Sequence, residues 1–138
     1  CYKAWSASNR SALIRIPASR GSATRLELRS PDPACNPYLA IAACLAAGLD
    51  GIQRDLTPPP EIPGNIYEMD AAQRAAFGIE SLPRTLEEAL EELRRDPLIL
   101  DVLGEHVAAH YIAGKQREWE EYQTRVSSWE LERYLVAY

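Results

Sequence analysis

The sequence predicts an α+β fold: an antiparallel sheet at the start of the chain, followed by a carboxy-terminal helical region. Short β-prone runs at residues 2–6, 12–16 and 24–29 predict the sheet, and the third run alternates polar and apolar residues. Apolar residues at intervals of three and four, from residue 85 onward, predict the helices. A turn-favouring Ser8-Asn9 pair between the first two runs favours antiparallel pairing.

The third β-prone run predicts a sheet with two different faces. Because strand side chains alternate, Arg25, Glu27 and Arg29 project from one face. Leu26 and Leu28 project from the other face, which we expect to line the core.

A helix is expected after this sheet. Asn36 is a favourable N-cap and Pro37 suits the first turn, while Gly48 and Gly51 suit its end. Leucines, an isoleucine and many alanines occupy most sides of this helix. We therefore expect it to be buried against the apolar face of the sheet.

The chain divides into three stretches by composition. Residues 1–56 hold the strands and the buried helix, and residues 57–84 form a Pro-rich arm, because four prolines in residues 57–63 prevent a helix or a central strand. Residues 85–138 form the helical region. Its first helix is expected to begin at a Thr85/Glu88 capping box, a second at Asp96-Pro97 and the last at Ser127. A long helix of about residues 105–126 is expected to bury a short list of residues: Ala108, Ile112, Trp119 and Tyr122.

Composition excludes several classes of protein. The 138 residues are 46% hydrophobic and 25% charged, as in globular proteins, and no apolar run approaches the ~20 residues of a membrane span. Three cysteines form no CxxC motif and no even framework, which indicates a reducing, cytoplasmic setting with Cys35 and Cys44 in the core. His106 and His110 lack the intervening glutamate of HExxH, so a metal site there is disfavoured.

Positive charge is concentrated at the start of the chain. Residues 1–60 carry seven Lys/Arg against four Asp/Glu, whereas the remainder carries eight against sixteen. Five of the six bases in the first thirty residues are arginine, whose planar fork of donors suits phosphates and carboxylates. An anionic ligand is therefore expected. Nucleic acid is not, because the stretch is short, the chain is acidic overall and aromatics do not interleave with the arginines.

The R-L-E-L-R run at residues 25–29 concentrates this chemistry. Glu27 lies between two guanidinium groups, and Arg10 and Arg15 come from the neighbouring strand and its turn. A carboxylate suits a divalent cation, and the surplus arginines suit phosphate oxygens. The alternative is a solvated strand face with weak surface salt bridges, and this spacing alone does not separate the two.

Three blocks in one order extend the argument: N-R-S-A-L-I-R-I-P at residues 9–17, R-L-E-L-R at residues 25–29 and D-P-A-C-N-P-Y-L-A at residues 32–40. Together they resemble the catalytic-domain signature of glutamine synthetase. The resemblance covers residues 1–138 as the carboxy-terminal part of that domain.

The resemblance implies ATP-dependent condensation of glutamate with ammonia through a γ-glutamyl phosphate, in a double-ring dodecamer. By family analogy Glu27 matches a ligand of Mg²⁺ or Mn²⁺, and Arg29 matches the arginine that stabilises the transferred phosphate. Arg10 would approach the phosphates and glutamate, and Arg15 and Arg25 would serve ATP. The other metal ligands of the family have no counterpart here, so we expect residues 1–138 alone to be inactive.

The resemblance also bears on regulation. The loop at residues 19–24 lacks the lysine that one bacterial group uses near the nucleotide, and Ser22 occupies its approximate place. The loop resembles that of the group that is often regulated by feedback and protein partners. Tyr67 falls near a tyrosine that other members adenylylate, but its surroundings differ, and we expect a structural role.

Two other functions are compatible with the sequence. One is a related ligase that joins glutamate to a polyamine or another amine with the same arginines. The other is a non-catalytic assembly or regulatory module, anchored by aromatic residues near the end of the chain: Trp119, Trp129, Tyr134 and Tyr138.

Overall fold

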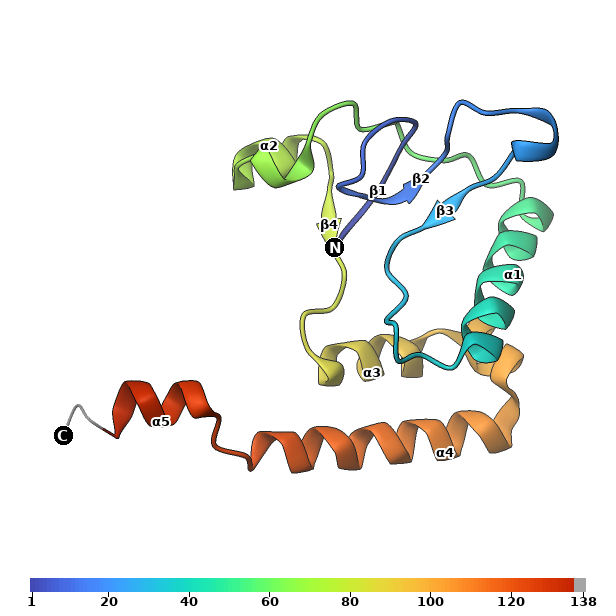
Figure 1. Ribbon diagram of the computed structural model, residues 1–138. Helices are drawn as coiled ribbons and strands as arrows, with labels where there is room; N and C mark the ends of the chain where they lie inside the picture. The colour runs from blue at the N-terminus through green and yellow to red at the C-terminus, as the bar shows by residue number, and fades with distance from the viewer. Residues whose placement is uncertain (136–138) are drawn as a thin grey trace. The chain divides into compact units, whose positions relative to one another are not determined.

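A computed structural model describes residues 1–135 and divides into two compact units, Cys1–Arg84 and Thr85–Tyr138. Figure 1 shows the strands in the first unit and a series of helices in the second. Tyr138, an expected anchor, lies outside the described residues.

The first unit contains a four-stranded sheet in the order β3-β2-β1-β4. Its strands are β1 (Tyr2–Ser6), β2 (Ala12–Arg15), β3 (Glu27–Leu28) and β4 (Glu80–Ser81). The β2–β3 and β1–β4 pairs are antiparallel, whereas β1 and β2 are parallel. The predicted α+β fold is thus confirmed as a mixed sheet with carboxy-terminal helices, and the antiparallel pairing expected for the first two strands is wrong.

The parallel β1–β2 pair arises because the chain reverses twice between them. Residues 7–11 can span about 16 Å when extended, enough to return to the start of β1. Asn9 Oδ1 accepts hydrogen bonds from the backbone nitrogen and the hydroxyl of Ser11, both at 2.8 Å. Beyond the pair, Ile16 N donates to the Ser6 carbonyl at 3.0 Å.

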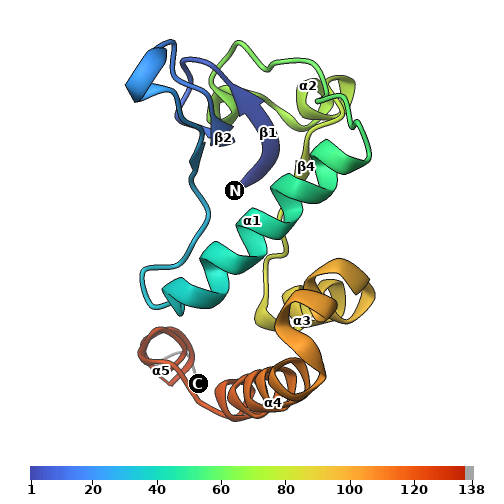
Figure 2. The same cartoon turned by 90° about the vertical axis from the view of Figure 1, so that its right-hand side faces the viewer.

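The helix α1 (Pro37–Gln53) begins where the sequence predicts, with Asn36 Oδ1 accepting from Tyr38 N at 3.0 Å. It is a single straight helix (Figure 2). Its burial is not as expected, since it contains no buried residue, and Leu26 of the sheet's expected core face is exposed as well. Within the described chain, these apolar residues have no partner large enough to cover them.

The core of the first unit instead comes from the Pro-rich arm. Ile62 and Ile66 are buried against Ala12 of β2, and Met69 and Ile79 pack beside them. The arm continues into two short helices, η2 (Ile66–Glu68) and α2 (Ala71–Ala76), and then into β4, none of which the sequence predicts. A short 3-10 turn, η1 (Gly21–Ala23), lies in the loop after β2.

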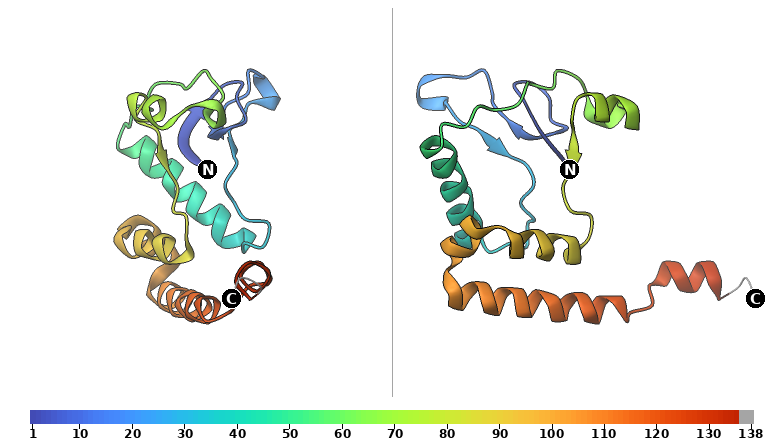
Figure 3. Two further views of the ribbon diagram at one scale, coloured as in Figure 1. Left: turned by 90° about the vertical axis from the view of Figure 1, so that its left-hand side faces the viewer. Right: turned by 180° about the vertical axis from the view of Figure 1, so that it is seen from behind.

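The second unit is built from α3 (Leu86–Arg95), α4 (Pro97–Gln123) and α5 (Ser128–Tyr134). Figure 3 shows α3 and α4 side by side in both views, and Arg94 Nη2 donates to Gln116 Oε1 at 2.9 Å between them. Gly104, at φ 71°, splits α4, so that its second segment starts near the expected residue 105. Leu90 and Ala108 are buried.

The predicted N-cap residues of these helices are in place, but some of the predicted burial is not observed. Thr85 accepts from Glu88 N at 3.1 Å, Asp96 caps α4, and Ser127 and Glu130 form a reciprocal capping box. Tyr122 is exposed, contrary to expectation; it lies one residue before the end of α4, and its ring stacks on that of Trp119.

All three cysteines, which lie within residues 1–135, are exposed. The expectation that Cys35 and Cys44 lie in the core is wrong, since both are exposed. Cys35 precedes α1 and Cys44 lies within it, and α1 contains no buried residue. In this described part of the chain no three His, Cys, Asp or Glu residues are placed to hold a metal together. Nor does it contain a helix whose length and hydropathy would allow it to span a bilayer.

Candidate functional site

The β2–β3 ladder places the acidic residue of the R-L-E-L-R run directly opposite an arginine. Arg15 and Glu27 are cross-strand partners, next to the Ile14–Leu28 pair. Arg15 Nη1 lies 3.1 Å from Glu27 Oε2 and 3.3 Å from Oε1, so one guanidinium nitrogen contacts both carboxylate oxygens. This pair is partly shielded, with side-chain exposures of 22% and 27%.

A second guanidinium reaches the same carboxylate along β3. Arg25 Nη2 and Nε donate to Glu27 Oε1 at 2.9 and 3.1 Å. The hydrogen bond from Arg15, followed by that from Arg25, holds the pKa of Glu27 below its ordinary value. Glu27 is therefore ionised between two cations, and the local charge of the three groups is net positive.

Arg10 and Arg29 lie beside this cluster rather than in it. Arg29 N donates to the Leu13 carbonyl at 2.9 Å, which extends the ladder beyond the Ile14–Leu28 pair. The Arg29 side chain then turns toward the preceding loop, where its Nε donates to the Arg10 carbonyl at 3.1 Å. The structure thus brings Arg15, Arg25 and Glu27 into direct contact and ties Arg29 to the backbone of Arg10.

The loop that carries Arg10 is positioned by its two neighbours, which the sequence argument missed. The Asn9 side chain donates to the Gly64 carbonyl, and Ser11 Oγ accepts from Ile66 N at 2.8 Å. Both bonds connect the loop to the Pro-rich arm. The signal was present in the sequence, since Asn and Ser flanking an arginine are residues that bind backbone groups in turns.

The cluster has the donors and charge for a phosphate. Within the described residues, Arg15 Nε is buried and has no hydrogen-bond partner. A buried N–H without a partner is costly, so Arg15 has a donor that its bond to Glu27 does not use. Arginine forks match the oxygens of both phosphates and carboxylates, so the strand pair has donors of the kind that a phosphate takes.

The residues also supply one ligand of the kind that Mg²⁺ takes. Among residues 1–135, Arg15 is the donor to Glu27 Oε2, so this oxygen retains capacity for a cation. Mg²⁺ in phosphate sites typically binds one or two carboxylates together with phosphate oxygens and waters. One carboxylate is thus compatible with part of such a set.

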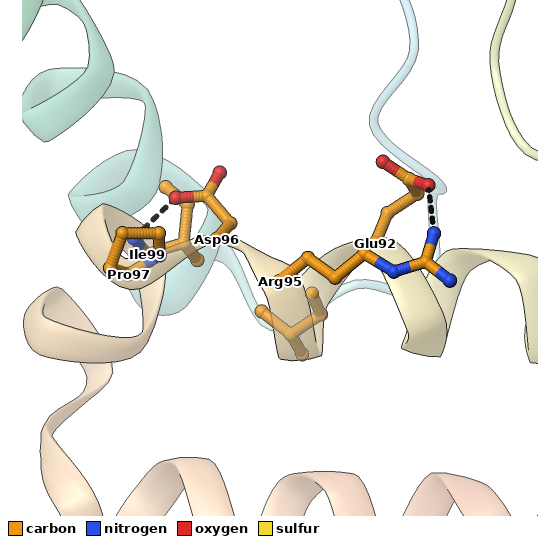
Figure 4. A pocket seen from close by; sticks show the side chains of 6 residues that line it. Glu92, Arg95, Asp96, Pro97 and Ile99 are labelled. Atoms are coloured by element: carbon orange, nitrogen blue, oxygen red, sulfur yellow. Dashed lines mark hydrogen bonds and ion pairs between the residues drawn. The ribbon is translucent and has the colours of Figure 1, made fainter.

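A pocket in the second unit lies at the junction of α3 and α4 and does not include this cluster (Figure 4). Its charged side chains are engaged with each other or with the helix start. Arg95 pairs with Glu91 and Glu92 at 3.4 and 3.2 Å, and Asp96 accepts from Ile99 N at 3.1 Å. The pocket is therefore a feature of the helix junction, and its groups serve local structure.

Tyr67 and the two histidines, which the sequence analysis considered for modification and metal binding, are all exposed. Tyr67 is exposed in η2, with its ring centroid 6.0 Å from that of Tyr2, so it contacts the sheet from the surface. His106 and His110 are exposed, with their ring centroids 4.2 Å apart and their planes tilted by 34°. The Nδ1 of His110 contacts the His106 carbonyl at 2.8 Å.

Comparison with known proteins gives consistent matches over nearly all of this chain. The model of the family described as "Glutamine synthetase, catalytic domain" matches residues 1–134. A glutamine synthetase of Thermus thermophilus is 60% identical over 135 residues, which are 98% of this chain and 30% of that protein. A glutamine synthetase of Thermotoga maritima is 55% identical over 134 residues, which are 97% of this chain and 30% of that protein.

A solved structure titled "Apo GmaS without ligand" has the same fold, with a TM-score of 0.77 and 35% identity. The match covers 97% of this chain and 30% of that chain. This chain therefore spans about 30% of the length of the relatives that it matches.

Proposed function

The chain belongs to the glutamine synthetase catalytic-domain family, and on that premise we propose that it is part of an ATP-dependent ligase that condenses glutamate with ammonia. The observation that carries the proposal is the Arg15–Glu27–Arg25 cluster on the β2–β3 pair, within the residues that the family model matches. The reaction would pass through a γ-glutamyl phosphate, which requires groups that bind and neutralise a phosphoryl group.

The arginines divide this work by position. Arg15 and Arg25, joined to Glu27, would bind the phosphates of ATP. Arg29, in the next step of the ladder, would stabilise charge on the phosphoryl group as it moves from ATP to the glutamate carboxylate. Arg10, in the loop tied to the Arg29 side chain, would approach both the phosphates and glutamate.

Glu27 would supply one ligand of a divalent cation, Mg²⁺ or Mn²⁺. When bound, such a cation bridges phosphate oxygens and neutralises their charge. Arg15 and Arg25 keep Glu27 ionised, and the Glu27 carboxylate in turn holds both guanidinium groups at the strand face.

The names of the relatives support ammonia as the acceptor, and we propose that the complete protein is a cytoplasmic enzyme of several subunits. The curated relatives are named glutamine synthetase, which favours ammonia over a larger amine. Because this chain spans about 30% of those relatives, we propose that the double-ring dodecamer and any regulatory protein partner belong to the complete enzyme. Residues 1–138 alone are expected to release no phosphate from ATP in the presence of glutamate and ammonia.

A chimera tests the proposal. Residues 1–135 replace the matching part of the Thermus thermophilus relative, and phosphate release is measured with ATP, glutamate and ammonia. The chimera should be active, and Arg29→Ala should lower turnover by about 10²–10³-fold, as for the removal of one donor to transition-state charge. Glu27→Ala should weaken the dependence of the rate on the divalent cation.

The matched control is Lys3→Ala, since Lys3 is an exposed cation of the same sheet that pairs with Glu80 and not with the cluster. Its turnover should equal that of the unaltered chimera. Unchanged kinetics in a correctly assembled Arg29→Ala chimera would contradict the proposed role, and activity with methylamine or a polyamine in place of ammonia would favour the related amine ligase.

A further inference from the structure

The two histidines of the chain lie one turn apart in α4, just after the break at Gly104. His106 and His110 are four residues apart, so their side chains leave the same side of the helix. Their ring centroids are 4.2 Å apart and both residues are exposed, whereas Ala108, between them in sequence, is buried. The two imidazoles therefore form a pair on the solvent side of α4.

A hydrogen bond determines which nitrogen of His110 is free to bind a ligand. The Nδ1 of His110 lies 2.8 Å from the His106 carbonyl oxygen. Because a carbonyl oxygen only accepts, Nδ1 carries a proton, and the lone pair of the neutral ring is then on Nε2. Histidines that bind metals usually donate their other ring nitrogen to a carbonyl or a carboxylate in this way. The backbone thus holds His110 in the tautomer that a metal ligand needs.

The separation of the two rings suits a single ion. Zn–N bonds of about 2.0–2.1 Å at a tetrahedral angle place two ligand nitrogens about 3.3 Å apart. The nitrogens lie off the ring centres, so rings whose centroids are 4.2 Å apart reach this separation by small rotations of the side chains. Within residues 1–135 no third His, Cys, Asp or Glu joins the pair, so water would complete the coordination.

The neighbouring residues on α4 leave both space and a favourable charge for a cation. Residues 102–114 contain no Lys or Arg, and their one charged residue is Glu105. The positions three and four residues after His110 are Ala113 and Gly114, and a Cβ added at Gly114 would meet nothing within 4 Å. A cation on the pair is therefore neither repelled nor covered by the residues next to it on the helix.

Imidazole ligands determine the class of ion. The glutamate of HExxH, which is missing here, is a general base for catalysis and is not needed for binding. Imidazole suits Cu²⁺, Ni²⁺ and Zn²⁺, whereas Mg²⁺ takes oxygen ligands. We propose that His106 and His110 together bind one divalent transition-metal ion of this class. The proposal goes beyond the ligase function and does not depend on it, since none of its residues belongs to the Arg15–Glu27–Arg25 cluster.

Titration with NiCl₂ tests the proposal. The exposed Cys1, Cys35 and Cys44 are first alkylated with iodoacetamide so that their thiols do not bind the metal. Isothermal calorimetry of the 138-residue chain should then show one ion per chain. CuCl₂ should bind more tightly than NiCl₂, and MgCl₂ should not compete. Equal Ni²⁺ binding by a chain in which both histidines are replaced, His106→Ala with His110→Ala, would overturn the proposal.

A matched variant separates one shared site from two independent imidazoles. His110→Ala should weaken Ni²⁺ binding by about tenfold or more, because the second ring binds within the same molecule at a high effective concentration. Adding Tyr111→His to His110→Ala restores the number of histidines but places them five residues apart, on different sides of the helix. This double variant should bind as weakly as His110→Ala. Binding restored to that of the unaltered chain would contradict a shared site. All three positions are exposed, and circular dichroism checks that the helices form.

Amide hydrogen exchange gives a second readout that needs no substitution. An ion held by both rings links two successive turns of α4, so the helix must release it in order to open there. Exchange in residues 106–114 should therefore slow by about tenfold when free Ni²⁺ is at ten times its dissociation constant. Exchange in the arm, at residues 57–66, should not change. Equal slowing in both regions, or no slowing in α4, would place the ion elsewhere and overturn the proposal.

Discussion

The helix α1 and the Pro-rich arm that follows it differ in how far their apolar residues are buried. The arm has little regular structure, yet Ile62 and Ile66 are buried at 4% and 0% exposure. The helix is regular over Pro37–Gln53, yet none of its residues is buried. Burial in this unit therefore follows from which segment is attached to the sheet, and not from hydrophobicity or helix formation.

The arm is attached through hydrogen bonds to β1 and to the loop after it. Trp5 Nε1 donates to the Pro59 carbonyl at 2.6 Å, and Ile62 N donates to the Trp5 carbonyl at 3.1 Å. Glu61 Oε1 accepts from Ala7 N at 2.7 Å. Prolines do not prevent this attachment, because the bonds use their carbonyl oxygens and the few N–H groups between them.

The largest expected effect separates the two regions by truncation. Ile66→Ala should lower the free energy of unfolding by about 2–5 kcal/mol, since it leaves a cavity beside Ala12 and Ile62. Ile41→Ala, at an exposed position of α1, should change it by less than about 0.5 kcal/mol. Urea unfolding of the isolated chain measures both, and equal losses would mean that α1 is packed within this chain after all.

A smaller effect is expected where the arm meets the Arg10 loop. Ser11 is buried and its hydroxyl accepts from Ile66 N, so Ser11→Ala leaves a buried N–H without a partner. The expected loss is about 1–3 kcal/mol in the free energy of unfolding. Ser8→Ala, at an exposed position of the same loop, is the control and should be close to neutral. A loss of unfolding free energy no larger than that of Ser8→Ala would show that the arm is held by its apolar contacts alone.

The sequence predicted the features that depend on residues close together in the chain, such as the helix caps. Asn36, Thr85 and Ser127 cap helices as expected, because a cap depends on residues within one turn. Arg15 and Glu27 were expected to share a face of neighbouring strands, and the β2–β3 register places them opposite each other.

Features that depend on distant contacts were not predicted. The parallel β1–β2 pair needs a double reversal at residues 7–11 that is held partly by the arm, through Gly64 and Ile66. Prolines indicate only that the arm is neither helix nor central strand, and so gave no sign that it forms the core. The composition of α1 predicted burial, but burial needs a covering surface that the described residues do not supply.

Removing the cap of α1 should have a moderate and local effect. Because tertiary packing contributes little to this helix, its stability depends on its own hydrogen bonds, and a helix of this length is marginal in water. Asn36→Ala should destabilise it by about 1 kcal/mol, seen as about fivefold faster amide hydrogen exchange in residues 40–46. Exchange in the arm, including Ile62 and Ile66, should not change. Faster exchange in both regions would indicate that they unfold together.

The smallest expected effect is a pH dependence that distinguishes β3, the last strand before α1, from the arm. Arg15 and Arg25 hold the pKa of Glu27 below its ordinary value of 4.5. A group whose pKa is lowered by folding stabilises the protein fully above its unfolded value, and this stabilisation is lost as the pH falls through the folded value. Glu27→Gln should therefore be less stable than the unaltered chain above pH 4.5, and the difference should shrink in stronger acid. Glu61→Gln is the matched control in the arm. If the difference for Glu27→Gln stays the same in stronger acid, or shrinks no more than that for Glu61→Gln, the arginines do not hold β3 through its carboxylate.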